Sequence, residues 1–162
     1  MSILLREEEI KKELAGKFSG ISASLKIARA RRIFAEVNQE EFMKVFSYVA
    51  KDLGFSHLCT ITGLDEQDRF SFLYHLAQDS GIILNLKTSV SKENPTIKTV
   101  TSFFAGADIY ERELMDLFGI KVEGLTSGSR YPLPDDWPVD QFPLRKDWHP
   151  QEGREEGENN HA

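Results

Sequence analysis

The fold is decided by residues 58–90, LCTITGLDEQDRFSFLYHLAQDSGIILNLKTSV. Three runs rich in aliphatic, aromatic and β-branched residues, Leu58–Leu64, Arg69–Leu76 and Ile82–Val90, are separated by the turn-forming tetrapeptides DEQD and QDSG. In the second and third runs apolar residues alternate with smaller or polar ones, which is the period of a strand with one buried face. Because short turns join antiparallel neighbours, the sequence predicts a mainly antiparallel meander.

Helices are predicted on the N-terminal side of this meander. One runs from Asn38, which forms an N-cap pair with Glu41, to Gly54, which ends it. Another is predicted over Ile3–Phe18, where apolar residues recur at helical spacing and acidic residues precede basic ones, as the helix dipole favours. Between them, Ile21–Val37 alternates in part and predicts an extended edge strand.

The sequence changes character on the C-terminal side. A short helix is predicted over Thr99–Phe104, and a second one begins with Asp108 as N-cap and Glu111 as its partner and ends at Gly119. From Lys121 to Pro150 five prolines disfavour regular structure. We therefore predict an α+β fold: a two-layer sandwich of a mainly antiparallel sheet with helices on one face, plus an extended irregular C-terminal arm.

The proline-rich arm also carries large side chains, including Trp137 and Trp148. A flexible linker would not hold two tryptophans and so much apolar area, so the sequence predicts an ordered arm that is buried against something. Charges of both signs lie beside the rings, and Trp, Tyr and Arg anchors on a pre-ordered segment are typical of a protein contact. The alternative is an arm folded back on its own sheet, and the two can hold for different faces.

Composition and charge limit the class of protein. The chain has 162 residues, a net charge of −6 and 40% hydrophobic residues, which predicts one soluble domain with its own core. The single cysteine, Cys59, cannot close an internal disulfide, and with no leader-like segment we expect a reducing cytoplasm. No apolar run approaches the ~20 residues of a membrane helix. The acidic balance argues against nucleic acid as a partner.

The charge is unevenly distributed along the chain. Residues 151–162, QEGREEGENNHA, hold four acidic and one basic side chain and no large apolar one. Such a segment cannot offset its ordering entropy by burial. We therefore expect an α+β domain over 1–124, a proline-rich ordered interaction arm over 125–150 and a disordered acidic tail over 151–162.

The densest charged group is the helix ERELMDLFG, residues 111–119. A helical projection places Glu113 between Ile109 and Leu117, within the apolar arc, where a carboxylate needs a partner. Arg112 and Asp116, four residues apart, are predicted to pair on the other side. The alternative is a free-standing enzyme that uses Glu111, Glu113 or Asp116 as acid and base or as metal ligands. Glu111 and Glu113 stand ~200° apart on a helix, which disfavours a shared site.

Other candidate sites are weaker. His57 and Cys59 form an H-x-C that would share one face of a strand, but zinc normally takes three or four protein ligands. Two half-buried sheet residues are the favoured interpretation. The sequence contains no G-x-S-x-G, Walker, G-x-G-x-x-G or C-x-x-C motif. We therefore expect no catalytic, cofactor-binding or metal-binding residues in this chain.

Three segments together resemble the family of the C subunit of respiratory complex I, the small hydrophilic subunit of NADH:quinone oxidoreductase: GADIYERELMDLFGIKVEG (106–124), YPLPDDWP (131–138) and FPLRKDW (142–148). They are more similar still to that family's counterparts in energy-converting, membrane-bound nickel-iron hydrogenases and formate hydrogenlyases. Weaker similarity extends the match to about Leu53–Trp148. The signature and expected interface residues are Glu111, Arg112, Glu113, Asp116, Gly119, Arg130, Pro134, Asp135, Asp136, Trp137, Leu144, Arg145, Lys146, Asp147 and Trp148.

Two departures favour the hydrogenase branch of this family. Complex I members usually continue with G-H-P-D-L-R where this chain has GLTSGSR, residues 124–130, without the histidine. The sequence also stops shortly after Trp148, without the long C-terminal extension that many complex I members carry. The small hydrophilic subunit of complex I proper stays as the alternative.

The resemblance implies an assembly role. It implies a non-cofactor-bearing subunit in the peripheral part of a membrane-bound oxidoreductase, packed against the catalytic large subunit of an energy-converting nickel-iron hydrogenase and near a small iron-sulfur subunit. Iron-sulfur clusters and a nickel-iron site, or flavin and quinone in the alternative, are expected in those partners. The expected location is the cytoplasmic face of the cell membrane, with membrane contact through other subunits and no nucleic acid.

Overall fold

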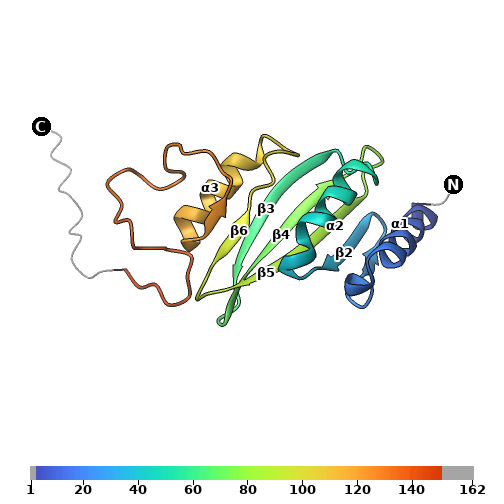
Figure 1. Cartoon of the computed structure of the whole chain (residues 1–162), viewed down its shortest axis with the longest axis horizontal. Helices are drawn as coiled ribbons and strands as arrows, with labels where there is room; N and C mark the ends of the chain where they lie inside the picture. Colours follow the sequence, from blue (N-terminus) through green and yellow to red (C-terminus); the bar gives the residue numbers. More distant parts are fainter. Residues whose placement is uncertain (1–2, 151–162) are drawn as a thin grey trace, which may run out of the picture.

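The computed structural model describes residues 3–150, and its centre is a five-stranded sheet with the order β1-β2-β5-β4-β3 (Figure 1). Three long strands, β3 (His57–Asp65), β4 (Arg69–Ala77) and β5 (Ile83–Ser91), form consecutive antiparallel pairs. The predicted meander and the α+β class are therefore confirmed. The predicted acidic tail lies outside the described residues.

The edge strand predicted over residues 21–37 is in fact two short strands and a tight turn. β1 (Lys26–Arg29) pairs antiparallel with β2 (Arg32–Glu36), and residues 30–31 make the turn between them. β2 also pairs with β5, in parallel. A local pattern cannot reveal a parallel pair, because the two strands are joined by a long crossover connection. Here the connection runs through α2 (Gln39–Lys51) and the β3–β4 hairpin.

The helices pack on one face of the sheet, as predicted (Figure 1). The ring of Phe42 on α2 lies 4.8 Å from the ring of Tyr74, centroid to centroid. The ring of Phe118, at the end of α3 (Ala107–Phe118), lies 5.9 Å from that of Phe70. Because Phe70 and Tyr74 are four residues apart on β4, both rings point to the same face.

The N-terminal helix α1 (Ile3–Lys17) completes this layer and confirms the predicted helix. Just after it, the ring of Phe18 meets the ring of Tyr48 on α2 edge-on, with centroids 5.6 Å apart. The largest fully buried side chains are Tyr74, Phe46, Phe55, Phe70, Phe72, Ile10, Leu14, Ile21, Ile33, Leu76, Ile82 and Leu84. None of the described helices is long and apolar enough to cross a lipid bilayer.

The local signals around α2 are confirmed in detail. The Asn38 side chain accepts a hydrogen bond from the backbone amide of Glu41 at 2.8 Å, which caps the helix. Gly54 follows the helix with a φ of +70°, a left-handed conformation that glycine adopts without steric cost. The start and end of this helix could therefore be predicted from single residues.

A second, two-stranded parallel sheet pairs β6 (Thr96–Lys98) with β7 (Lys121–Glu123). The helix predicted over Thr99–Phe104 is wrong, since these residues form turns after β6. The carboxylate of Glu111 on α3 accepts the backbone amide of Val100 at 2.7 Å, so a side chain holds this segment in place of a helical ladder.

Residues 125–150 contain no helix or strand and form an irregular C-terminal arm beside α3, as predicted (Figure 1). The backbone amide of Leu144 donates to the carbonyl of Leu117 at 3.1 Å. The guanidinium of Arg130 pairs with the Asp116 carboxylate at 3.1 Å. One side of the C-terminal arm therefore contacts its own domain.

Candidate functional site

The carboxylate that points into the apolar layer beneath α3 is Glu111, and the prediction of Glu113 is wrong. Glu111 is 0% exposed, whereas Glu113 is half-buried. The buried residues of α3 are Ala107, Glu111, Leu114, Asp116 and Phe118. The helical projection places the buried face of the helix wrongly because it takes Ile109 as a core residue. The side chain of Ile109 is in fact 50% exposed.

Glu111 is held by two hydrogen bonds from the segment after β6. The Thr99 hydroxyl donates to one carboxylate oxygen at 2.6 Å, and the backbone amide of Val100 donates to the other at 2.7 Å. Burial raises the pKa of Glu111, and the two hydrogen bonds offset this only in part, so its pKa stands above its ordinary value. The carboxylate ties α3 to the turns beneath it.

Arg112 pairs with Asp108, one turn earlier in α3, and the predicted pair with Asp116 is wrong. The two guanidinium nitrogens lie 2.9 and 3.0 Å from the two carboxylate oxygens of Asp108. Asp108 is not the N-cap either, because that position belongs to Gly106 and Asp108 lies within the first turn. The guanidinium also donates to the carbonyl of Thr126 at 2.8 Å, which fixes the start of the C-terminal arm.

Asp116 holds the next part of the C-terminal arm. One carboxylate oxygen lies 3.1 Å from Nε of Arg130, and the other accepts the backbone amide of Leu133 at 3.2 Å. Arg130 also donates to the carbonyl of Trp137 at 2.6 Å. Asp116 and Glu111 are thus engaged with different partners, and the structure does not gather the helix carboxylates into one acid-base pair.

Arg145 fastens the far part of the C-terminal arm. Its Nε donates to the carbonyl of Phe118 at 2.6 Å, and its guanidinium lies 4.4 Å from the ring centroid of Phe142 and 5.1 Å from that of Phe70. A Cβ at Gly119 would lie 2.6 Å from this guanidinium, and Gly119 has a φ of +68°. Only glycine allows this close approach and this backbone conformation at the end of α3.

Asp65 is a contact point that the sequence did not reveal, because it lies in a tetrapeptide that indicates only a turn. Its side chain is 2% exposed and pairs with Lys92 at 2.7 Å. It also accepts the backbone amide of Lys146 at 2.9 Å, which joins the C-terminal arm to the end of β3. Burial acts to raise the pKa of Asp65, but hydrogen bonds from Lys92, Lys146 and Gln67 hold it below its ordinary value.

The two tryptophans of the C-terminal arm pack on each other. The ring centroids of Trp137 and Trp148 are 6.1 Å apart and the planes are tilted by 35°. The indole N–H of Trp137 donates to the carbonyl of Gln141 at 2.9 Å. The indole nitrogen of Trp148 is buried and has no hydrogen-bond partner among residues 3–150. The aromatic pair therefore gives the arm an apolar centre of its own.

The C-terminal arm exposes large apolar residues at three positions. Val139 is 82% exposed, Leu144 is 52% exposed and Tyr131 is 43% exposed, and we call these three residues the outer arm surface. The other exposed residues predicted for an interface are Pro134, Asp135, Asp136, Lys146 and Asp147. The arm is thus anchored to α3 and to the end of β3, and these three apolar side chains nevertheless stay exposed.

Histidine and cysteine do not combine into a metal site in the described part of the chain. His57 is exposed and Cys59 is half-buried at a register shift in β3. Across residues 3–150, no group of three or more His, Cys, Asp or Glu side chains could hold a metal ion. His75 instead joins a hydrogen-bonded row on the sheet face opposite the helices, 2.9 Å from the Thr62 hydroxyl and 2.5 Å from the Asn85 side chain.

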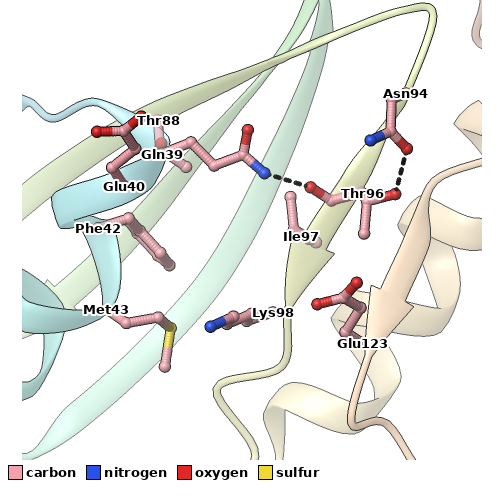
Figure 2. Close-up of a pocket in the computed structure, with 10 residues that line it drawn as sticks. All are labelled: Gln39, Glu40, Phe42, Met43, Thr88, Asn94, Thr96, Ile97, Lys98 and Glu123. Carbon is pink, nitrogen blue, oxygen red and sulfur yellow. Dashed lines mark hydrogen bonds between the residues drawn. The ribbon is translucent and has the colours of Figure 1, made fainter.

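A cavity of about 330 Å³ lies between the start of α2 and the β6–β7 sheet (Figure 2). Phe42, Met43 and Ile97 supply apolar walls, and Gln39 closes one side by donating to the carbonyl of Thr96 at 2.7 Å. This cavity is separate from the C-terminal arm, and none of the residues predicted for the interface lines it.

Comparison with protein families and curated proteins gives a consistent result. The family model described as respiratory-chain NADH dehydrogenase, 30 Kd subunit, matches residues 35–154. The C subunit of F(420)H(2) dehydrogenase from Methanosarcina mazei is 34% identical over 138 residues, which cover 83% of this chain and 87% of the relative. The C subunit of NADH-quinone oxidoreductase from Roseiflexus castenholzii is 37% identical over 92 residues, which cover 56% of this chain and about half of the relative (52%).

Solved structures show the same fold. A chain from the membrane-bound sulfane sulfur reductase, an archaeal respiratory membrane complex, superposes with a TM-score of 0.75 at 25% identity and covers 88% of this chain and 85% of its own length. The trypsin-resistant fragment of Nqo5 gives a TM-score of 0.65 at 27% identity and covers 76% of this chain and 99% of the fragment.

Proposed function

The chain belongs to the respiratory-chain NADH dehydrogenase 30 kDa subunit family, and from this we propose that it is a non-cofactor-bearing assembly subunit in the peripheral part of a membrane-bound respiratory oxidoreductase. The relatives support this, because they are named as the C subunits of F(420)H(2) dehydrogenase and of NADH-quinone oxidoreductase. The structural neighbour from an archaeal respiratory membrane complex supports it further.

The observation that carries the proposal is the outer arm surface. Val139 exposes 82% and Leu144 52% of their surface, although the segment around them is anchored by Arg130 and Arg145. An anchored segment loses little conformational entropy on binding, and apolar and aromatic side chains on it are efficient contacts. The C-terminal arm is therefore suited to dock on another subunit.

The proposed partner is the catalytic large subunit, with a small iron-sulfur subunit nearby. The histidine-free segment 124–130 supports a nickel-iron hydrogenase type, whose metal site and clusters belong to those partners. The names of the relatives support a second candidate, a dehydrogenase complex that takes electrons from F(420)H(2) or NADH.

Copurification tests the docking surface. In the native host, a tagged chain with Leu144→Asp should recover much less large subunit than the wild type, because a carboxylate would be buried in the contact. Leu5→Asp is the matched control, because Leu5 is also a half-exposed leucine (56%) and lies on α1, away from the C-terminal arm. Circular dichroism should show both variants folded. Equal recovery with Leu144→Asp and Leu5→Asp would refute the docking role of the arm.

The type of complex is tested on the copurified material. Nickel in stoichiometric amount, hydrogen production and two C-x-x-C pairs in the large subunit would assign the hydrogenase type, because thiolates hold such a metal site. Reduction of a quinone-type acceptor by F(420)H(2) or NADH, without nickel, would assign the second candidate.

A further inference from the structure

The tip of the β1–β2 hairpin carries three arginines within four residues, Arg29, Arg31 and Arg32, which we call the arginine turn. Arg29 and Arg31 are exposed and Arg32 is half-buried. Across residues 3–150, no carboxylate forms an ion pair with any of the three guanidinium groups. Positive charge is thus concentrated at one point of a chain whose net charge is −6.

Two features of the arginine turn oppose folding. Arg29 and Arg32 are directly opposite each other in the antiparallel pair, and like charges in that position repel. Arg31 has a φ of +61°, in the left-handed region that glycine or asparagine normally occupies in such turns. A glycine at position 31 and an acidic residue at position 29 would each make the isolated chain more stable.

The backbone of the arginine turn is nevertheless firmly held. The amide of Arg31 donates to the buried carboxylate of Glu7 on α1 at 2.5 Å. The carbonyl of Arg31 accepts the amide of Ile83 on β5 at 3.0 Å and a guanidinium nitrogen of Arg32 at 2.8 Å. The backbone of the turn is therefore tied to a helix and to a neighbouring strand.

Protection of a sheet edge does not explain this arrangement. β1 is the last strand of the sheet, and charged residues or a register shift on such a strand prevent unwanted pairing. Lys26 and the shift between Ile27 and Arg29 already supply both devices. Neither device requires opposed arginines or an arginine in a left-handed conformation.

We propose that the arginine turn and the free edge of β1 bind an extended, acidic segment of another subunit of the same complex. This inference rests on the proposed assembly function. The planar guanidinium group binds carboxylates with two parallel hydrogen bonds, so arginines in place of lysines fit a segment rich in Asp and Glu. A protein segment can also pair with the unpaired backbone groups of β1, which a lipid or a nucleic acid cannot do.

The contact lies away from the C-terminal arm, because β1 and β2 are at the opposite end of the molecule (Figure 1). The two contacts can therefore be tested separately. Arg29→Glu converts the like-charge pair with Arg32 into an opposite-charge pair, so the melting temperature of the chain should be unchanged or higher. When the tagged chain is purified from the native host, recovery of the subunit that carries the acidic segment should fall at least about tenfold.

Lys44→Glu is the matched control, because Lys44 is an exposed lysine on α2, outside the arginine turn. It should leave recovery unchanged. Edge protection alone predicts equal recovery with Arg29→Glu and Lys44→Glu, and that result would overturn the inference. It would leave the proposed assembly function standing, because that function is tested at Leu144.

Crosslinking identifies the occupant. Ala30, which is exposed between the arginines, is replaced by p-benzoylphenylalanine in the tagged chain, and the assembled complex is irradiated and analysed by mass spectrometry. A crosslinked peptide from another subunit with several Asp or Glu residues in an extended run is the expected result, and Arg29→Glu should abolish it. Crosslinks only to lipid, to nucleic acid or to peptides without acidic residues would overturn the proposal.

Discussion

The Asp116–Arg130 pair should hold the C-terminal arm against α3 and should contribute little to the stability of the core. Asp116 accepts from Nε of Arg130 at 3.1 Å and from the amide of Leu133 at 3.2 Å, and both contacts lie between α3 and the arm. Asp116→Ala removes both acceptors. Arg130 keeps its contact with the carbonyl of Trp137, so the segment loosens and is not released entirely.

The size of the effect follows from burial. The side chains of Asp116 and Arg130 are 11% and 19% exposed, so the pair is close to buried. Removal of one partner of a fully buried pair costs about 3–5 kcal/mol. Partial exposure and the remaining contact of Arg130 reduce this to about 2–3 kcal/mol of local opening free energy, which corresponds to a roughly 30- to 150-fold loss of protection.

Hydrogen exchange measures this directly, residue by residue. The amides of Leu133 and Leu144 should lose protection in Asp116→Ala, whereas amides in the centre of β4 should keep theirs. Asp135→Ala is the control, because Asp135 is an exposed carboxylate on the same arm. If the arm amides exchange as in the wild type, or if β4 loses protection to the same extent, the assignment of Asp116 as the anchor of the arm is wrong.

Three further substitutions have defined outcomes. Gly63→Ala would place a Cβ 2.6 Å from the ring of Phe118 and should cost about 1–3 kcal/mol in thermal unfolding. The pKa of Glu111 is raised from its ordinary value of 4.5, so the free energy of unfolding of the wild type should fall as pH rises from 4.5 through the pKa of the folded state. Glu111→Gln should remove this pH dependence, as measured by urea unfolding at a series of pH values. The pKa of Asp65 is lowered from 3.8, so the ionised carboxylate stabilises the fold at neutral pH and this stabilisation is lost as pH falls. Asp65→Asn should be about 1–3 kcal/mol less stable than the wild type near neutrality. In acid unfolding curves its stability should fall less steeply with decreasing pH than that of the wild type.

Elements with strong local signals could be predicted from the sequence. The meander followed from alternation between turn residues, and α2 followed from the Asn38 cap and the glycine after the helix. The parallel pairing of β2 with β5 could not be predicted, because it depends on a contact between distant segments. The turn at residues 30–31 was missed since arginine is an unusual residue in a left-handed position.

The contacts between α3 and the C-terminal arm could not be predicted from the sequence. The family signature includes residues of both α3 and the C-terminal arm, but it does not say that the two meet. The partners of Asp116 and Asp65 lie 14 and 81 residues away in the sequence, and no periodicity encodes such distances. The inward carboxylate was misassigned because one exposed residue, Ile109, shifted the apolar arc of the helix.

Two departures from local rules lie at opposite ends of the molecule. At one end, Arg31 is left-handed and Arg29 opposes Arg32, and at the other, Val139 is an exposed valine on an anchored segment. A sequence selected for stability alone would avoid these choices. Both proposals start from such positions: the proposed function places an apolar contact near Val139, and the further inference places an electrostatic contact at the arginine turn.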